Sequence, residues 1–134
     1  MVIQAKHPRV MIFLCALLLA TPLHAQEHPT FESLWKEAVQ NPRCKPADYS
    51  DFVLVTCESQ FTFWYFTKPN HVAHPGVIKR VLYEENGTWL AREEGHSFAS
   101  DAAQPAFKAW LAQIADLDRQ MREEIGKQKG ETAK

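Results

Sequence analysis

An Asn-Gly dipeptide at positions 86 and 87 constrains the fold of this 134-residue chain more than any other feature. Both residues of a tight two-residue turn need a positive φ, which asparagine and glycine adopt most easily. The dipeptide therefore predicts a β-hairpin of residues 77–85 with residues 88–96. The turn also fixes the register, which places two pairs of opposite charge face to face: Arg80 with Glu93, and Lys79 with Glu94. We expect both to be solvated ion pairs that support the hairpin.

Two stretches with apolar residues at three- and four-residue steps predict amphipathic helices. The first begins at Thr30, a good N-cap residue, and ends before Pro42, which cannot continue a helix. The second begins at Ser100 or Asp101 and continues to residue 125. The predicted hairpin therefore has a helix on either side of it in the sequence.

Two further runs, residues 52–57 and 61–67, are rich in β-branched and aromatic residues and predict strands. The second run is apolar at odd and even positions, so we interpret its aromatic side chains as core and the run as a central strand. Residues 42–50 and 68–76 are interrupted by prolines and predict loops. The predicted fold class is α+β: a four-stranded antiparallel β-meander flanked by an N-terminal and a C-terminal helix, in the order α-β-β-β-β-α.

Residues 1–25 have the features of a cleaved secretory signal peptide. Lys6 and Arg9 give a positive start, residues 11–20 are apolar, and a small-residue exit ends at Ala25. The apolar run is roughly half as long as a membrane-spanning helix, so we expect no stable membrane insertion after cleavage. An uncleaved amphipathic anchor is the alternative. We therefore expect a periplasmic or secreted protein.

The chain left after this cleavage has the length of one domain. We assign residues 26–125 to a single α+β domain, and residues 126–134, which have no apolar anchor, to a disordered polar tail. Without Lys6 and Arg9 the chain has 13 basic residues against 16 acidic ones. This mild negative charge disfavours binding to nucleic acid, which uses a basic surface. The sequence contains no phosphate-binding glycine loop and no nucleophile motif, so we expect a protein that is not an enzyme.

Two cysteines, Cys44 and Cys57, remain once the leader takes Cys15 with it. An even number of cysteines in an oxidising compartment predicts a disulfide. The bond would close a loop of about 14 residues, which the chain-entropy estimate values at roughly 3 kcal/mol. A redox-active pair is the alternative, but the C-x-x-C spacing that tunes such thiols is absent. A thiolate metal site is a second alternative.

The loop predicted over residues 68–76 is the candidate recognition site, because exposed loops carry much of the binding function of small domains. The residues assigned to partner binding are Lys68, Pro69, Asn70, His71 and His74. The leading hypothesis is a small exported binding, inhibitor or accessory module. Its partner would be an unknown protein or small ligand of the periplasm or the extracellular space.

The alternative hypothesis is a periplasmic Cu- or Zn-binding protein that uses His71, His74 and His96. The hairpin register places His96 opposite Val77, at the same end of the sheet as the loop, and Asp51 should lie there too. Imidazoles and a carboxylate are the ligands that Zn²⁺ and Cu²⁺ prefer. Against this, no specific metal-binding spacing is present. Loop histidines also often hydrogen-bond the backbone and fix the loop. No cofactor is therefore predicted unless the three histidines converge.

Overall fold

The computed structural model describes the backbone of residues 28–132 and the side chains of residues 28–117, 119 and 120. The predicted signal peptide lies outside the described residues. The elements along the chain are α1 (Phe31–Gln40), β1 (Lys45–Asp48), β2 (Phe52–Cys57), η1 (Glu58–Gln60), β3 (Thr62–Thr67), β4 (Gly76–Glu85), β5 (Thr88–Ser97), η2 (Asp101–Ala103) and α2 (Gln104–Thr132). The fold is α+β, as predicted.

The sheet is antiparallel and has five strands in the order β1-β2-β3-β4-β5, so the predicted count of four is wrong. The missed strand is β1, which lies in the segment predicted as a loop and pairs Ala47 with Leu54 of β2. Its four residues are all exposed and show no alternation of apolar and polar side chains. Pro46 also has no N–H to donate, so it suits only an edge strand. The chain order after the first helix is therefore five strands rather than four.

Helix α1 begins and ends where the sequence predicts. Thr30 is the N-cap and accepts a hydrogen bond from the N–H of Ser33, whose hydroxyl in turn accepts from the N–H of Thr30. This reciprocal capping box satisfies two of the donors that a helix N-terminus leaves without partners. Asn41 is the C-cap, directly before Pro42. The helix is therefore only ten residues long, which leaves part of the sheet beyond it uncovered.

The predicted hairpin of β4 and β5 is confirmed with its register. Asn86 and Gly87 both have positive φ, 52° and 76°. Arg80 lies opposite Glu93, and Lys79 opposite Glu94. The expectation of two solvated cross-strand ion pairs is wrong in both cases. The pair of Arg80 with Glu93 is buried rather than solvated, and Lys79 forms its ion pair with a residue of α1 instead.

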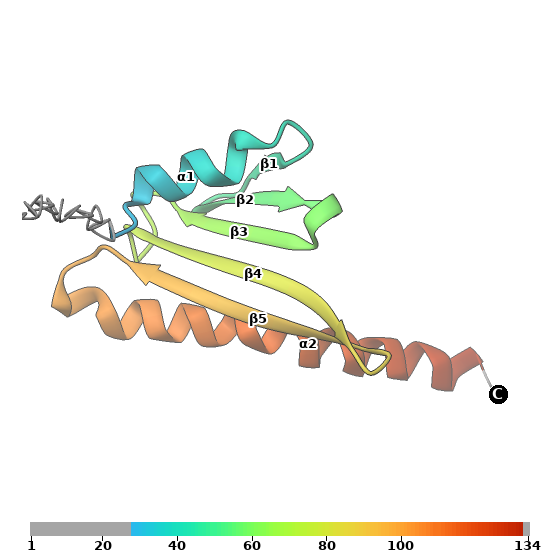
Figure 1. The fold of residues 1–134 in the computed structure, drawn as a ribbon. Helices are drawn as coiled ribbons and strands as arrows, with labels where there is room; N and C mark the ends of the chain where they lie inside the picture. Colours follow the sequence, from blue (N-terminus) through green and yellow to red (C-terminus); the bar gives the residue numbers. More distant parts are fainter. Residues whose placement is uncertain (1–27, 133–134) are drawn as a thin grey trace, which may run out of the picture.

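The two helices cover opposite faces of the sheet, which gives three layers (Figure 1). Because side chains alternate along a strand, each face has its own apolar cluster. The cluster under α1 consists of Leu34, Ala38, Cys44, Val55, Cys57, Trp64, Phe66 and Val77. The cluster under α2 consists of Tyr65, Ala73, Ile78, Phe107, Trp110 and Ile114. Strand β3 contributes to both clusters, which confirms the prediction that it is central.

Helix α2 runs along β5 (Figure 1) and begins after the short turn η2. It approaches closely because two strand residues beneath it are glycines. A Cβ atom added at Gly76 or Gly95 would lie within 3.0 Å of the Phe107 ring. The helix continues to Thr132, so residues 126–132, predicted as a disordered tail, are helical. Four of its seven residues, Lys127, Gln128, Lys129 and Glu131, are good helix formers, whereas Gly126 and Gly130 are poor ones. Within residues 28–132, no helix is long and apolar enough to cross a membrane.

Cys44 and Cys57 form the predicted disulfide, with their Sγ atoms 2.11 Å apart. Cys44 lies just beyond α1, and Cys57 is the last residue of β2. Both side chains are buried in the cluster under α1. The bond therefore ties the end of the short helix to the end of a strand that α1 covers.

A double variant, Cys44→Ala with Cys57→Ala, should lower the free energy of unfolding by roughly 3 kcal/mol, because it releases the loop of about 14 residues in the unfolded chain. Urea unfolding of the oxidised wild type and of the variant measures the difference. A variant as stable as the wild type would show that the bond adds no stability.

A charged cluster is buried between the sheet and α2. Nε of Arg80 lies 3.6 Å from Oε1 of Glu93, and the two side chains are only 6% and 15% exposed. Nη1 of Arg80 also donates to the backbone carbonyl of Ile114 in α2, at 3.3 Å. The neighbouring Tyr65 is buried as well, and this burial raises the pKa of its phenol, although the Arg80 guanidinium acts in the opposite direction. Arg80 thus links both strands of the hairpin to the helix above them.

Removing one charge of this pair should be costly, whereas replacing both should not. Glu93→Ala leaves the guanidinium buried without its carboxylate, and we expect a loss of about 3 kcal/mol in the free energy of unfolding. The double variant Arg80→Met with Glu93→Leu removes the desolvation penalty of both ions and should unfold near the wild-type urea midpoint. If the double variant is less stable than Glu93→Ala, the pair contributes net stability and this account of it fails.

Candidate functional site

The loop between β3 and β4 is held against the connection between β1 and β2. Nζ of Lys68 lies 2.7 Å from a carboxylate oxygen of Asp48 and donates to the backbone carbonyl of Tyr49. The side-chain amide of Asn70 donates to the backbone carbonyl of Ser50, at 3.0 Å. Two of the residues predicted to bind a partner, Lys68 and Asn70, therefore make contacts within the chain itself.

His71, another predicted binding residue, faces the interior. Its side chain is 7% exposed, and its ring lies 4.7 Å from the ring of Trp110 in α2. Nδ1 accepts a hydrogen bond from the N–H of Ala73, at 3.0 Å. Because Nδ1 acts as the acceptor, the proton of the neutral ring is on Nε2. Nε2 lies 3.8 Å from Asp51, so the ring is oriented by contacts on both sides.

His74 lies on the other face of the sheet, where its ring meets Phe31 of α1 edge to face at 5.8 Å. Its Nδ1 lies 3.0 Å from the hydroxyl of Thr67 and 3.1 Å from the carbonyl of the same residue. The Thr67 hydroxyl also donates to the carbonyl of Gly76 and accepts from its N–H. His74 and Thr67 therefore hold the two ends of the loop together.

The three histidines predicted as metal ligands do not converge. His96 lies opposite Val77 as predicted, but Nε2 of its ring is 3.0 Å from a carboxylate oxygen of Glu94. His71 packs towards α2, whereas His74 packs towards α1. Among the described residues, no group of three or more histidine, cysteine, aspartate or glutamate side chains could hold a metal ion. The loop histidines instead fix the loop through hydrogen bonds, which is the other interpretation of the sequence.

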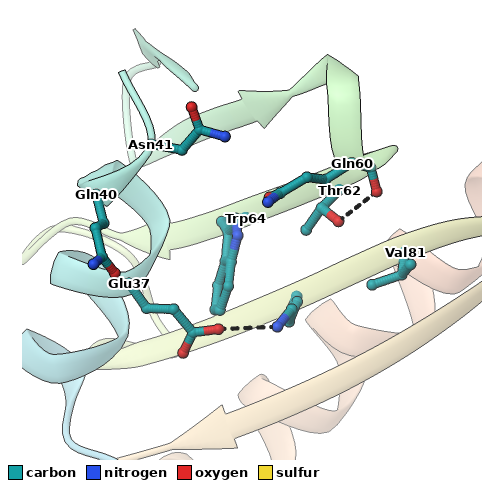
Figure 2. Close-up of a pocket in the computed structure, with 8 residues that line it drawn as sticks. Glu37, Gln40, Asn41, Gln60, Thr62, Trp64 and Val81 are labelled. Atoms are coloured by element: carbon teal, nitrogen blue, oxygen red, sulfur yellow. Dashed lines mark hydrogen bonds and ion pairs between the residues drawn. The ribbon is translucent and has the colours of Figure 1, made fainter. Parts of the chain in front are cut away.

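A different part of the molecule contains a hollow of about 520 Å³. It lies between the end of α1 and strands β3 and β4, on the face of the sheet that α1 covers only in part (Figure 2). We call it the α1 groove. Its lining residues are Glu37, Gln40, Asn41, Gln60, Thr62, Trp64, Lys79 and Val81.

The groove exists because α1 stops early and the disulfide holds its end. Asn41 and Gln60, which line it from the helix side and from the sheet side, are each three residues from a cysteine of the disulfide. Side chains of β3 and β4 form its floor, since alternate residues of a strand share one face. Had the helix continued past Pro42, it would have covered this part of the sheet.

The two ionisable groups of the groove neutralise each other. Nζ of Lys79 lies 3.1 Å from Oε1 of Glu37, a contact between β4 and α1. The same ammonium lies over the ring of Trp64, 4.5 Å from its centroid. An ammonium above an aromatic ring is attracted by the negative face of that ring. These contacts hold the lysine side chain in one place on the groove floor.

Three polar groups of the lining have no hydrogen-bond partner among the described residues. They are the side-chain amides of Gln40 and Gln60 and the indole N–H of Trp64. The two amides are exposed to solvent, but Trp64 is only 3% exposed. Figure 2 shows the indole nitrogen on the side of the ring that faces Gln60. The indole nitrogen is not one of the fully buried polar atoms that lack a partner, so it reaches the hollow and can donate to a ligand there.

No protein-family model, no curated protein and no solved structure matches the chain. We therefore infer a function from the chemistry of the groove.

The sequence did not single out the groove residues. The sequence pattern predicts that Trp64 is a core residue, which its burial supports. It also predicts that Lys79 pairs with Glu94 of the neighbouring strand, whereas the structure pairs it with Glu37. One signal was available. Pro42 ends α1 after ten residues, and the polar residues at that end of the helix therefore border an uncovered part of the sheet.

Proposed function

We propose that the protein is a small exported module, periplasmic or secreted, that binds a polar ligand in the α1 groove and does not act as an enzyme. The leader-like residues 1–25 support export, and the disulfide is compatible with an oxidising compartment. An inhibitor or accessory role fits the same description, since such proteins act by binding rather than by catalysis.

The observation that carries the proposal is the indole N–H of Trp64, which reaches the groove from an otherwise buried side chain. This N–H has no hydrogen-bond partner among the described residues and can only donate, so it is available to an acceptor on a ligand. The amides of Gln40 and Gln60 border the same hollow and can donate and accept. A hollow of about 520 Å³ also lies within the range of small-ligand sites.

Binding fits this lining better than catalysis does. Glu37 and Lys79, its ionisable groups, form an ion pair with each other. A general acid or base instead needs a position from which it can exchange a proton with a substrate. The lining supports the recognition of a ligand by hydrogen bonds.

Recognition through the 68–76 loop has weaker support, because Lys68, Asn70, His71 and His74 hold the loop in place. Changing them would disturb the loop itself. Pro69 and Val72 are exposed, and Val72 is 77% exposed, so they offer a way to test the loop without breaking these bonds. The Cu- or Zn-binding alternative has no support from the positions of the described histidines.

Native mass spectrometry of the protein isolated from its exported fraction tests the proposal. The wild type should carry a non-covalent small ligand, and Gln60→Ala with Lys79→Met should lose it, because two contacts of the groove are removed. The matched control is Pro69→Ala with Val72→Ser, which changes two exposed loop residues and should retain the ligand. Loss of the ligand in the loop variant, with retention in the groove variant, would place recognition in the loop and contradict the proposal.

A further inference from the structure

We propose that the ligand of the α1 groove is a neutral oligosaccharide, an inference that rests on the proposed function. Its basis is the combination of a lining without net charge, side-chain amides without hydrogen-bond partners, an indole donor, and an exposed aromatic ring further along β4. Each of these selects against other classes of small ligand.

The charge of the lining selects a neutral ligand. One carboxylate and one ammonium line the groove, 3.1 Å apart, so their fields largely cancel at the position of a ligand. An anion would have to displace Glu37 from Lys79, and a cation would have to displace Lys79 from Glu37. A neutral ligand leaves this ion pair intact.

The hydrogen-bonding groups match adjacent hydroxyls. A primary amide offers a donor and an acceptor side by side, as Gln40 and Gln60 do at the groove border. The hydroxyl of Thr62 donates to the backbone carbonyl of Gln60, at 2.9 Å, so its lone pairs remain as acceptors. The indole N–H of Trp64 can only donate, and a sugar hydroxyl, ring oxygen or acetamido carbonyl would accept from it.

An aromatic ring lies further along β4, beyond the residues that line the groove. Tyr83 is two residues beyond Val81, and alternation places both on the same face of the strand. Tyr83 lies opposite Leu90 of β5 and is 40% exposed. The negative face of an aromatic ring attracts the C–H groups of a pyranose in the way it attracts other positive edges. A linear sugar could therefore place one unit in the groove and the next over Tyr83.

The hairpin offers a matched control for this ring. Trp89 is 51% exposed, but its cross-strand partner is Glu84. It therefore lies on the face of the sheet opposite to that of Tyr83. Its ring contacts that of Phe61, with centroids 5.1 Å apart. Trp89→Ala thus removes an exposed aromatic side chain from the same hairpin without touching the proposed site.

The test is isothermal titration calorimetry of the oxidised mature chain with neutral tri- and tetrasaccharides of hexoses and of N-acetylhexosamines. At least one sugar should bind the wild type. Gln60→Ala and Tyr83→Ala should each weaken that binding about tenfold, as expected for the loss of one good contact. Tyr83→Phe, which keeps the ring, and Trp89→Ala should stay within about twofold of the wild type.

Two results would overturn the proposal. One is the absence of binding by every neutral sugar up to about 10 mM. The other is sugar binding that Trp89→Ala weakens as much as Tyr83→Ala does. If no sugar binds but native mass spectrometry shows a charged ligand that Gln60→Ala with Lys79→Met loses, the ligand class is wrong and the proposed function stands. If no ligand of any kind depends on these groove residues, both proposals fail.

Discussion

The disulfide between Cys44 and Cys57 is the constraint on which the arrangement of this protein most depends. It joins the segment after α1 to the end of β2, across a sequence separation of 13 residues. Asn41 and Gln60, which border the α1 groove, lie three residues from the two cysteines, so the bond holds the groove together. Without it, the end of the ten-residue helix would depend on the packing of Ala38 and on the ion pair of Glu37 with Lys79.

Strand β4 organises the two faces of the sheet because adjacent residues point in opposite directions. Lys79 reaches the α1 side, where it pairs with Glu37 above Trp64. Arg80 reaches the α2 side, where it meets Glu93 and the carbonyl of Ile114. The lysine keeps a partly exposed side chain in the groove, whereas the arginine is buried under a helix. One hairpin register thus sets both the candidate site and the main polar contact of the core.

Features encoded by neighbouring residues could be predicted from the sequence. The turn at Asn86 gave the hairpin register, Thr30 gave the start of α1, and the cysteines gave the disulfide. Features that depend on packing could not be predicted in this way. Strand β1 has no apolar pattern and forms only because β2 offers it an edge. The burial of Arg80 depends on where α2 lies, and the contact of Lys79 with Glu37 joins residues 42 positions apart.

The central claim is that the indole N–H of Trp64 donates a hydrogen bond to a ligand in the α1 groove. A ¹H–¹⁵N spectrum of the indole groups tests it most directly, because the chain has four tryptophans and three of them serve as internal controls. On addition of a neutral oligosaccharide that binds, the Trp64 signal should shift strongly, while those of Trp35, Trp89 and Trp110 stay in place. A shift confined to Trp89, or binding without any change at Trp64, would contradict the account.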